Sequence, residues 1–190
     1  MSEVREYDSQ PRLSEFLGEL SYSGYKDLGF DKILLVEGAT EIKTIQQFLR
    51  KYQKDHTIIV LPLGGSQMIN GSREVELEEI KRISNNISAI IDSERNTEND
   101  PLSSDREDFK LICENIGIEC HVLKFRSTEN YLSDQAVKSV KGVKYSALQP
   151  YQKLDELKYG WAKSENWRIA RVMSKDELEA TDLGKFILEL

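Results

Sequence analysis

Acidic residues stand directly after two short apolar runs of this sequence, at the points where buried strands would end. The residues are Glu37 and Glu41 after the first run, and Asp92 and Glu94 after the third. Parallel strands end at one edge of a sheet, where open α/β sheets bind ligands, so we expect these carboxylates to converge. Converging carboxylates repel one another unless a cation lies among them, and hard oxygen ligands favour Mg²⁺ or Mn²⁺. The pattern therefore predicts metal-dependent chemistry on a phosphodiester.

The spacing of apolar residues along the chain predicts the strands and helices that would position these acids. Four short, almost continuous apolar runs predict buried strands, at 32–36, 57–61, 87–91 and 119–125. Apolar residues at three- and four-residue spacing predict helices after each of them, at 40–52, 74–83, 105–116 and 128–140. This alternation indicates an α/β fold, in which a mostly parallel sheet of about four strands has helices on both faces.

The two ends of the chain differ from this α/β core. The alternation stops near residue 142, and the pattern beyond it predicts helices at 152–157, 163–173 and 175–190. The first 30 residues are polar and mixed, with a helix predicted at 12–20. We therefore expect an N-terminal extension or junction at 1–30, the α/β core at 31–141, and a helical C-terminal part of the same domain at 142–190.

Composition limits the classes of protein to be considered. No apolar run is long enough to span a membrane, and the first residues have no apolar stretch of a secretory signal. Cys113 and Cys120 form no paired motif and are predicted to be reduced packing residues of a cytoplasmic protein. The net charge is −7 and the pI about 5.1, whereas domains that grip nucleic acid alone are usually basic. Because the chain is acidic, binding or cleaving a phosphodiester would need metal ions, a local basic surface or a basic partner.

Two further sets of residues have both a functional and a structural interpretation. Gly64 and Gly65 follow the second strand, and they either let the backbone approach a phosphate or form a plain tight turn. Arg168 and Arg171 lie on a predicted helix and form either a phosphate-binding face or an ordinary solvated face. No Ser-His-Asp or Cys-His arrangement for nucleophilic catalysis is visible in the sequence.

Three motifs, in this order, resemble those of a Toprim domain, the catalytic fold of topoisomerases, bacterial primases and several nucleases. They are LLVEG at 34–38, LGG at 63–65 and AIIDSE at 89–94. The likeness is closest to the Toprim region of overcoming-lysogenisation-defect (OLD) family nucleases, because RSTENYL at 126–132 looks like their segment after the fourth strand. The resemblance covers about residues 31–190.

This resemblance implies a metal-dependent DNA endonuclease or nickase that uses two Mg²⁺ or Mn²⁺ ions, of a kind found in phage defence. It implies that Glu37 is a general acid/base or a shared metal ligand. It also implies a set of metal ligands, namely Glu41, Asp92, Glu94 and Glu129. Lys163 matches the C-terminal lysine that these nucleases place near the scissile phosphate, although a solvated helix lysine is the alternative. DNA is the implied substrate, an ATPase in the same protein or another chain the implied partner, and a homo-oligomer is possible.

The sequence departs from the family pattern at two points. Glu94 stands where the Toprim motif has a second aspartate, and its extra methylene moves the carboxylate away from the backbone. The P-loop of the OLD ATPase does not occur in this sequence. Two alternatives within the fold are a primase- or topoisomerase-like phosphotransferase and a non-catalytic interaction module. A haloacid-dehalogenase-like phosphatase is disfavoured, since Asn96 stands where its motif has Thr or Val.

Overall fold

The computed structural model describes residues 29–64 and 74–190 of the 190-residue chain. The predicted helix at 12–20, nearly all of the predicted extension and Gly65 lie outside these residues. Within them, no helix is both long enough and apolar enough to cross a membrane. Cys113 and Cys120 are free thiols.

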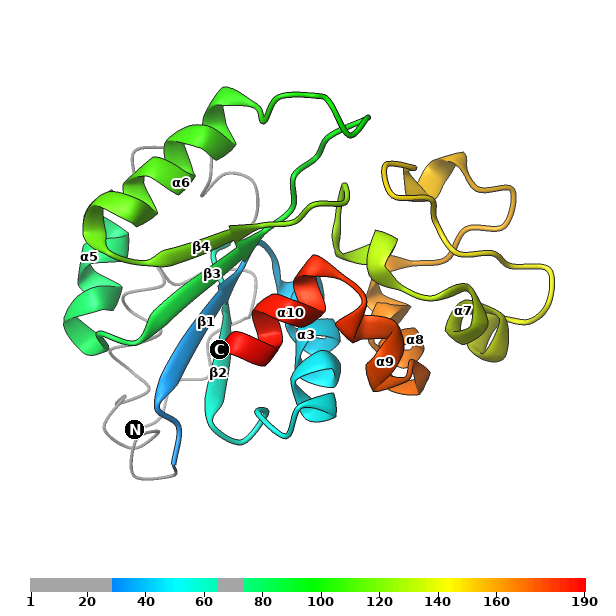
Figure 1. Cartoon of the computed structure of the whole chain (residues 1–190), viewed down its shortest axis with the longest axis horizontal. Helices are drawn as coiled ribbons and strands as arrows, with labels where there is room; N and C mark the ends of the chain where they lie inside the picture. Colours follow the sequence, from blue (N-terminus) through cyan, green and yellow to red (C-terminus); the bar gives the residue numbers. More distant parts are fainter. Residues whose placement is uncertain (1–28, 65–73) are drawn as a thin grey trace, which may run out of the picture.

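Four parallel strands form one sheet in the order β2-β1-β3-β4 (Figure 1). They are β1 (Lys32–Val36), β2 (Ile58–Pro62), β3 (Ile87–Ile91) and β4 (Glu119–Val122). The predicted α/β fold is confirmed, but β4 ends three residues before the predicted end. Beyond Val122, other groups take up the backbone: the Lys124 N–H donates to the Asp182 carboxylate at 2.9 Å, and the Phe125 N–H to the Tyr131 hydroxyl at 3.0 Å. The Leu123 N–H still donates to the Ile91 oxygen at 3.0 Å, and these side-chain bonds replace the regular strand pairing after it.

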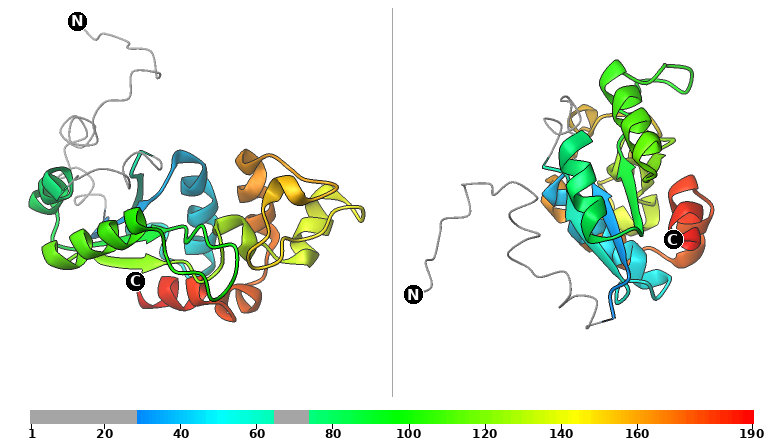
Figure 2. Two further views of the ribbon diagram at one scale, coloured as in Figure 1. Left: turned by 90° about the horizontal axis from the view of Figure 1, so that it is seen from above. Right: turned by 90° about the vertical axis from the view of Figure 1, so that its left-hand side faces the viewer.

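Helices cover both faces of the sheet, as the sequence predicted. Helices α5 (Glu74–Ile83) and α6 (Ser104–Ile116) lie on one face, and α3 (Ala39–Lys51) and α10 (Asp182–Glu189) on the other (Figures 1 and 2). Side chains along β1 alternate between two separate cores. Ile33 and Leu35 pack with α5 and α6, whereas Leu34 and Val36 pack with α3 and α10. This two-residue alternation explains why β1 is apolar almost throughout.

The strand order reverses between β1 and β3. Helix α3 connects β1 to β2 on one side of β1, and helix α6 connects β3 to β4 on the opposite side of the sheet. The carboxyl ends of β1 and β3 therefore lie side by side, with their connections leaving in opposite directions. Open α/β sheets bind ligands at this type of position, because the departing loops leave a crevice there.

The C-terminal part is helical, but it is more broken than predicted. The predicted helix at 128–140 is a 3₁₀ turn, η1 (Thr128–Tyr131), followed by α7 (Asp134–Lys141). The Ser133 hydroxyl caps α7 by accepting from the Ala136 N–H, so a new helix begins where continuation was expected. The rest consists of η2 (Leu154–Glu156), η3 (Lys163–Glu165), α8 (Asn166–Val172), α9 (Lys175–Glu179) and α10.

Capping explains the other breaks too. The predicted helix at 175–190 is divided because the Thr181 hydroxyl accepts from the Gly184 N–H and starts α10. At 152–157 the predicted helix is only the short turn η2, so residues 142–162 are largely irregular. The C-terminal part shares a core with the sheet, because Trp161 and Ile169 are buried in the same cluster as Leu34.

Candidate functional site

Glu37 and Asp92 are adjacent at the point where the strand order reverses. Glu37 follows β1, Asp92 follows β3, and the Asp92 N–H donates to Glu37 Oε2 at 3.4 Å. Burial is the main cause that raises the pKa of Glu37, and the negative charges of Glu94 and Glu41 add to it, while Arg106 opposes it. The predicted convergence of acids from two strands is therefore present at this edge of the sheet.

Asp92 is the most constrained of these acids. It is 5% exposed, and its Oδ1 accepts from the Thr128 N–H at 3.1 Å and the Thr128 hydroxyl at 3.3 Å. Burial raises the pKa of Asp92 well above its usual value, and the charges of Glu129, Glu37 and Glu41 raise it further. Asp92 thus fixes the start of η1 while lying in a site that disfavours its own charge.

Glu41 reaches the site from the first turn of α3, which begins directly after Gly38. A Cβ atom at Gly38 would lie 2.7 Å from Glu41 Oε2, so a residue without a side chain leaves the space that this carboxylate occupies. The Thr40 hydroxyl also donates to Glu41 Oε1 at 2.9 Å. The Glu-Gly-x-x-Glu spacing therefore places the Glu41 carboxylate back over the helix start, toward Glu37 and Asp92.

Glu129 is a buried carboxylate whose main partner is one lysine. It is 1% exposed, and Lys163 Nζ lies 2.7 Å from its Oε1. Within the described part of the chain, neither Glu129 oxygen accepts a well-oriented hydrogen bond, so the contact with Lys163 is an ion pair of poor angle. Burial lowers the pKa of Lys163, but Glu129, Asp92 and Glu41 outweigh burial and raise it. Lys163 therefore stays charged, and it links the C-terminal part to the acids.

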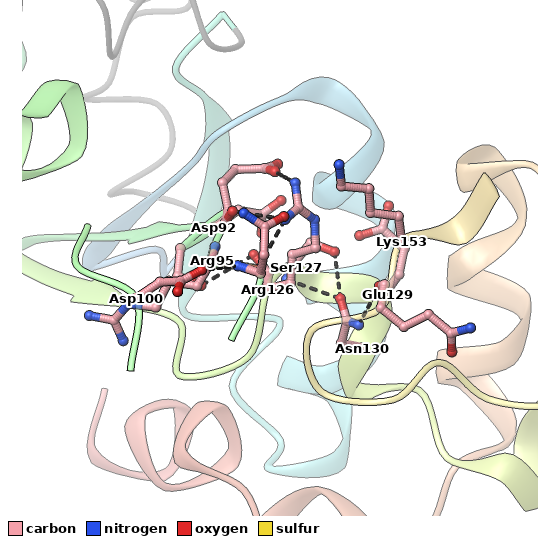
Figure 3. A network of polar contacts seen from close by, with 12 residues as sticks. Asp92, Arg95, Asp100, Arg126, Ser127, Glu129, Asn130 and Lys153 are labelled. Atoms are coloured by element: carbon pink, nitrogen blue, oxygen red, sulfur yellow. Dashed lines mark hydrogen bonds and ion pairs between the residues drawn. The ribbon is translucent and has the colours of Figure 1, made fainter. Parts of the chain in front are cut away.

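Glu94 is paired with a residue that sequence reasoning did not select. Its backbone has φ 55°, in the left-handed region, which turns the chain after β3. Its carboxylate contacts the Arg126 guanidinium, which also donates to the backbone oxygens of Glu94 at 2.8 Å and Arg95 at 3.0 Å (Figure 3). Arg126 belongs to the RSTENYL motif, so the fourth-strand loop holds the acid that follows β3.

Arg106 is a second residue that the sequence did not reveal. It lies on α6, is nearly buried, and donates to Glu37 Oε1 at 3.2 Å and to the Asp92 backbone oxygen at 2.7 Å. The available signal was its position on the apolar face of α6, three residues before Phe109 and seven before Cys113. A charged residue on such a face is buried with a partner, and here the partner is Glu37.

The acids have the chemistry of a hard-cation site, but each of three is already paired with a basic residue. Glu37 is matched by Arg106, Glu94 by Arg126 and Glu129 by Lys163. Among the described residues, no three acidic, His or Cys side chains are grouped as a ready-made cation site. Within the described chain no basic side chain is paired with the Asp92 carboxylate, because Arg106 contacts its backbone oxygen instead. The raised pKa of Asp92 and the Glu129 oxygens without a well-oriented donor both favour added positive charge at this point. The residues fit Mg²⁺ or Mn²⁺ in donor type and charge.

A pocket of about 800 Å³ is lined by two of these acids, Glu94 and Glu129, together with the basic Arg126 and Lys163. Most of its other lining residues come from the irregular segment between α7 and α8. The volume is within the range of about 300–1,000 Å³ found for ligand sites.

The other predicted residues lie elsewhere. Arg168 and Arg171 are exposed on α8 and are not among the residues that line this pocket in the described chain, so their positions favour the solvated-face alternative. Arg168 lies over the Trp167 ring at 5.5 Å. Gly64 has φ 98° and is exposed, which favours the tight-turn alternative after β2. The role predicted for Gly65 falls outside the described residues.

Comparisons with known proteins give no family: no family model matches the chain, and neither a curated protein nor a solved structure matches it significantly.

Proposed function

We propose that this domain is a metal-dependent DNA endonuclease or nickase of the Toprim type, most similar to OLD family nucleases. The observation that carries the proposal is the pair of buried carboxylates, Asp92 and Glu129. Their mutual repulsion raises the pKa of Asp92, next after burial itself, and Glu129 has no well-oriented donor among the described residues. Burying two like charges together is costly unless a cation binds between them. A divalent ion would supply that charge.

The acids would hold the ions, and their elements set the roles. Asp92, Glu94, Glu41 and Glu129 are the proposed ligands, with Glu37 as a shared ligand or general acid/base. Bound Mg²⁺ or Mn²⁺ would lower the pKa of an attacking water and neutralise charge on the phosphodiester. Glu37 is suited to accept a proton, because burial raises its pKa while Arg106 at 3.2 Å fixes its orientation.

Lys163 is the proposed contact to the scissile phosphate. Its side chain is 49% exposed although its ammonium reaches a buried carboxylate, so it can turn from Glu129 toward the pocket. Its pKa is raised by Glu129, Asp92 and Glu41 against the effect of burial, so it is protonated over the working pH range. A charged ammonium at this position would bind a non-bridging phosphate oxygen.

The setting of the enzyme is part of the proposal. An ATPase, in the same protein or in a separate chain, would supply control and added affinity for DNA. Homo-oligomerisation and a role in phage defence are carried over from the resemblance to OLD nucleases. A cytoplasmic location is proposed because Cys113 and Cys120 are free thiols in the fold.

A non-catalytic interaction module is the second candidate, and one observation favours it. Each of Glu37, Glu94 and Glu129 already has a basic partner from this chain, which would stabilise the site without any ion. The two candidates differ in what a metal does. A nuclease should bind Mn²⁺ and cleave, whereas an internally neutralised module should do neither.

A nicking assay on supercoiled plasmid separates the candidates. Cleavage is expected with Mg²⁺ or Mn²⁺ and not with EDTA. Asp92→Asn should abolish it while Asp108→Asn, an exposed aspartate on α6, leaves it unchanged. Equal activity of Asp92→Asn and the control would reject the site, and absence of cleavage by wild-type protein that still binds DNA would favour the interaction module.

A further inference from the structure

The segment between α7 and α8 has a composition unlike the rest of the chain. Residues 141–163 contain five lysines and two acids, a balance of +3 in a chain whose net charge is −7. The same 23 residues contain three tyrosines and a tryptophan. Interleaved basic and aromatic residues on an irregular backbone are typical of surfaces that bind single-stranded nucleic acid.

This segment is tied to the turn that carries Glu129. The Arg126 N–H donates to the Pro150 oxygen at 2.8 Å, and the Asn130 amide donates to the Gln152 oxygen at 2.9 Å. These two donors lie on either side of Glu129 in the chain. The segment therefore lies beside the acids in a fixed position, although it contains little regular structure.

Two tyrosines of the segment form an accessible aromatic pair at the pocket. Tyr145 lines it, and the Tyr159 ring lies 6.0 Å from the Tyr145 ring at an angle of 51°. Tyr159 is 42% exposed, so part of its face is open to a ligand. The ammonium groups of Lys141 and Lys158 lie over these rings at 5.6 and 5.5 Å. Aromatic faces thus lie next to positive charge.

Lysines line the same pocket as Tyr145 and the acids Glu94 and Glu129. Lys141, Lys153 and Lys163 line the pocket, and Lys141 and Lys163 are paired with Glu165 and Glu129. The exposed Lys153 shares the pocket with Arg126, and in Figure 3 no contact among the residues drawn joins its ammonium to another group. Lys153 therefore offers a charge that is open to a ligand, in the pocket that Tyr145, Glu94 and Glu129 also line.

We propose that the pocket binds an unpaired nucleic-acid strand, with bases against Tyr145 and Tyr159 and phosphates along Lys153 and Lys163. The strand leads toward Asp92 and Glu129, so the inference rests on the proposed function for what happens to it there. An unpaired strand is the matching substrate class because its bases expose π-faces, whereas bases of a closed duplex are stacked on one another. Strand ends, flaps or melted DNA would then be the preferred substrates.

Binding is measured by fluorescence anisotropy with the full chain in EDTA. The probes are a labelled single-stranded oligonucleotide and a dumbbell duplex of the same length, whose closed ends cannot fray. We expect the single strand to bind more tightly. Equal or tighter binding of the dumbbell overturns the inference. An RNA oligonucleotide of the same sequence that binds like the DNA strand supports it, because stacking and phosphate contacts do not require the deoxyribose.

Variants separate stacking from a structural effect. Tyr159→Ala should weaken single-strand binding about fivefold or more, because one base–aromatic stack contributes about 1–3 kcal/mol. Tyr159→Phe should restore it, because the ring is kept and the hydroxyl is lost. The matched control is Tyr151→Ala, a tyrosine of the same segment that, in the described chain, neither lines the pocket nor packs on the Tyr145 ring as Tyr159 does. Unchanged binding by Tyr159→Ala, or an equal loss in the control, overturns the stacking role.

The lysine contact has its own readout. Lys153→Gln should reduce the slope of log Kd against log salt by about 0.7, the value for one phosphate contact to a single strand. Lys144→Gln, an exposed lysine of the segment outside the pocket lining, should leave the slope unchanged. An unaltered slope in Lys153→Gln overturns the phosphate path.

The two proposals fail in different ways. Tight, tyrosine-dependent binding in EDTA without cleavage in Mg²⁺ or Mn²⁺ leaves the pocket assignment standing and rejects the nuclease. If the protein cleaves DNA with Mg²⁺ or Mn²⁺ but its single-strand binding does not change in the Tyr159 and Lys153 variants, the nuclease proposal stands and the pocket assignment is rejected.

Discussion

Replacing Asp92 by asparagine should stabilise the metal-free protein, and the gain should grow with pH. Asparagine keeps the Oδ1 that accepts from the Thr128 N–H and hydroxyl, so the local hydrogen bonds survive. It removes the carboxyl whose pKa is raised by burial and by the charges of Glu129, Glu37 and Glu41. The substitution therefore tests the electrostatics of the site with little change in its shape.

The sign follows from proton linkage. Below about pH 4, the ordinary pKa of aspartate, Asp92 is protonated in both folded and unfolded chains and costs nothing. As pH rises toward the folded-state pKa, the unfolded chain loses its proton first, so the stability of wild type falls while that of the variant does not. Each unit by which the fold raises a carboxyl pKa is about 1.4 kcal/mol. For a chain of this size, that unit corresponds to about 3–5 °C in Tm.

Thermal melts of wild type and Asp92→Asn in EDTA, from pH 5 to pH 9, measure this difference. Asp108→Asn serves as the control, and its difference from wild type should stay flat with pH. Adding Mn²⁺ should reverse the order, because ligand at about 100 times its Kd stabilises the folded state by about 2.7 kcal/mol in wild type and less in the variant. A variant that is less stable than wild type at pH 8 in EDTA would refute the reasoning, since it would mean that Asp92 is a stabilising ion there.

Three more changes test the supports of the site. Gly38→Ala should displace the flexible end of Glu41 and lower metal-dependent cleavage while changing the unfolding free energy by less than about 1 kcal/mol, as plasmid nicking and urea melts would show. Arg106→Lys cannot reproduce the forked contact to Glu37 and the Asp92 oxygen, so it should cost about 1–3 kcal/mol in urea melts and move the acidic limb of the pH–rate profile upward. Burial would raise the pKa of Asp182, but hydrogen bonds from His121, the Lys124 N–H and Tyr131 outweigh it and lower that pKa. The ionised Asp182 should therefore stabilise the fold fully above about pH 4, and this stabilisation should be lost below it. Asp182→Ala should flatten this acid dependence of Tm.

The sequence predicted the framework of the site well because local rules determine it. Short and mostly apolar runs marked the four strands of the sheet, and position at a strand end was enough to predict that Glu37 and Asp92 lie together. Glu129 was predicted only through the resemblance of RSTENYL to the OLD segment, and it is buried near enough to Asp92 for its charge to raise the pKa of Asp92. A positional signal thus predicted Glu37 and Asp92, whereas a family motif predicted Glu129.

The missed features depend on contacts between distant segments. Arg106 and Arg126 looked like ordinary helix and loop charges, and their roles arise only when α6 and the β4 loop pack against the acids. The helix predicted at 128–140 was wrong in detail because apolar spacing continues through Leu132, whereas the Ser133 cap starts a new helix. The tyrosines and lysines of residues 141–163 form no recognised functional motif in the sequence, and it is the fold that brings Tyr145, Lys141 and Lys153 to one pocket.

The position of that segment bears on the conflict between an acidic chain and an anionic substrate. A net charge of −7 disfavours nonspecific attraction of DNA over the whole surface, so an approaching strand is repelled except where charge is locally reversed. The +3 segment supplies such a reversal, and Arg126 and Asn130 fasten it beside Glu129. An electrostatic path of this kind would select a strand flexible enough to follow it, which a duplex is not. In the proposed arrangement, the acidic surface would limit where nucleic acid binds, and the lysines of the segment would direct the strand to the proposed metal-binding edge.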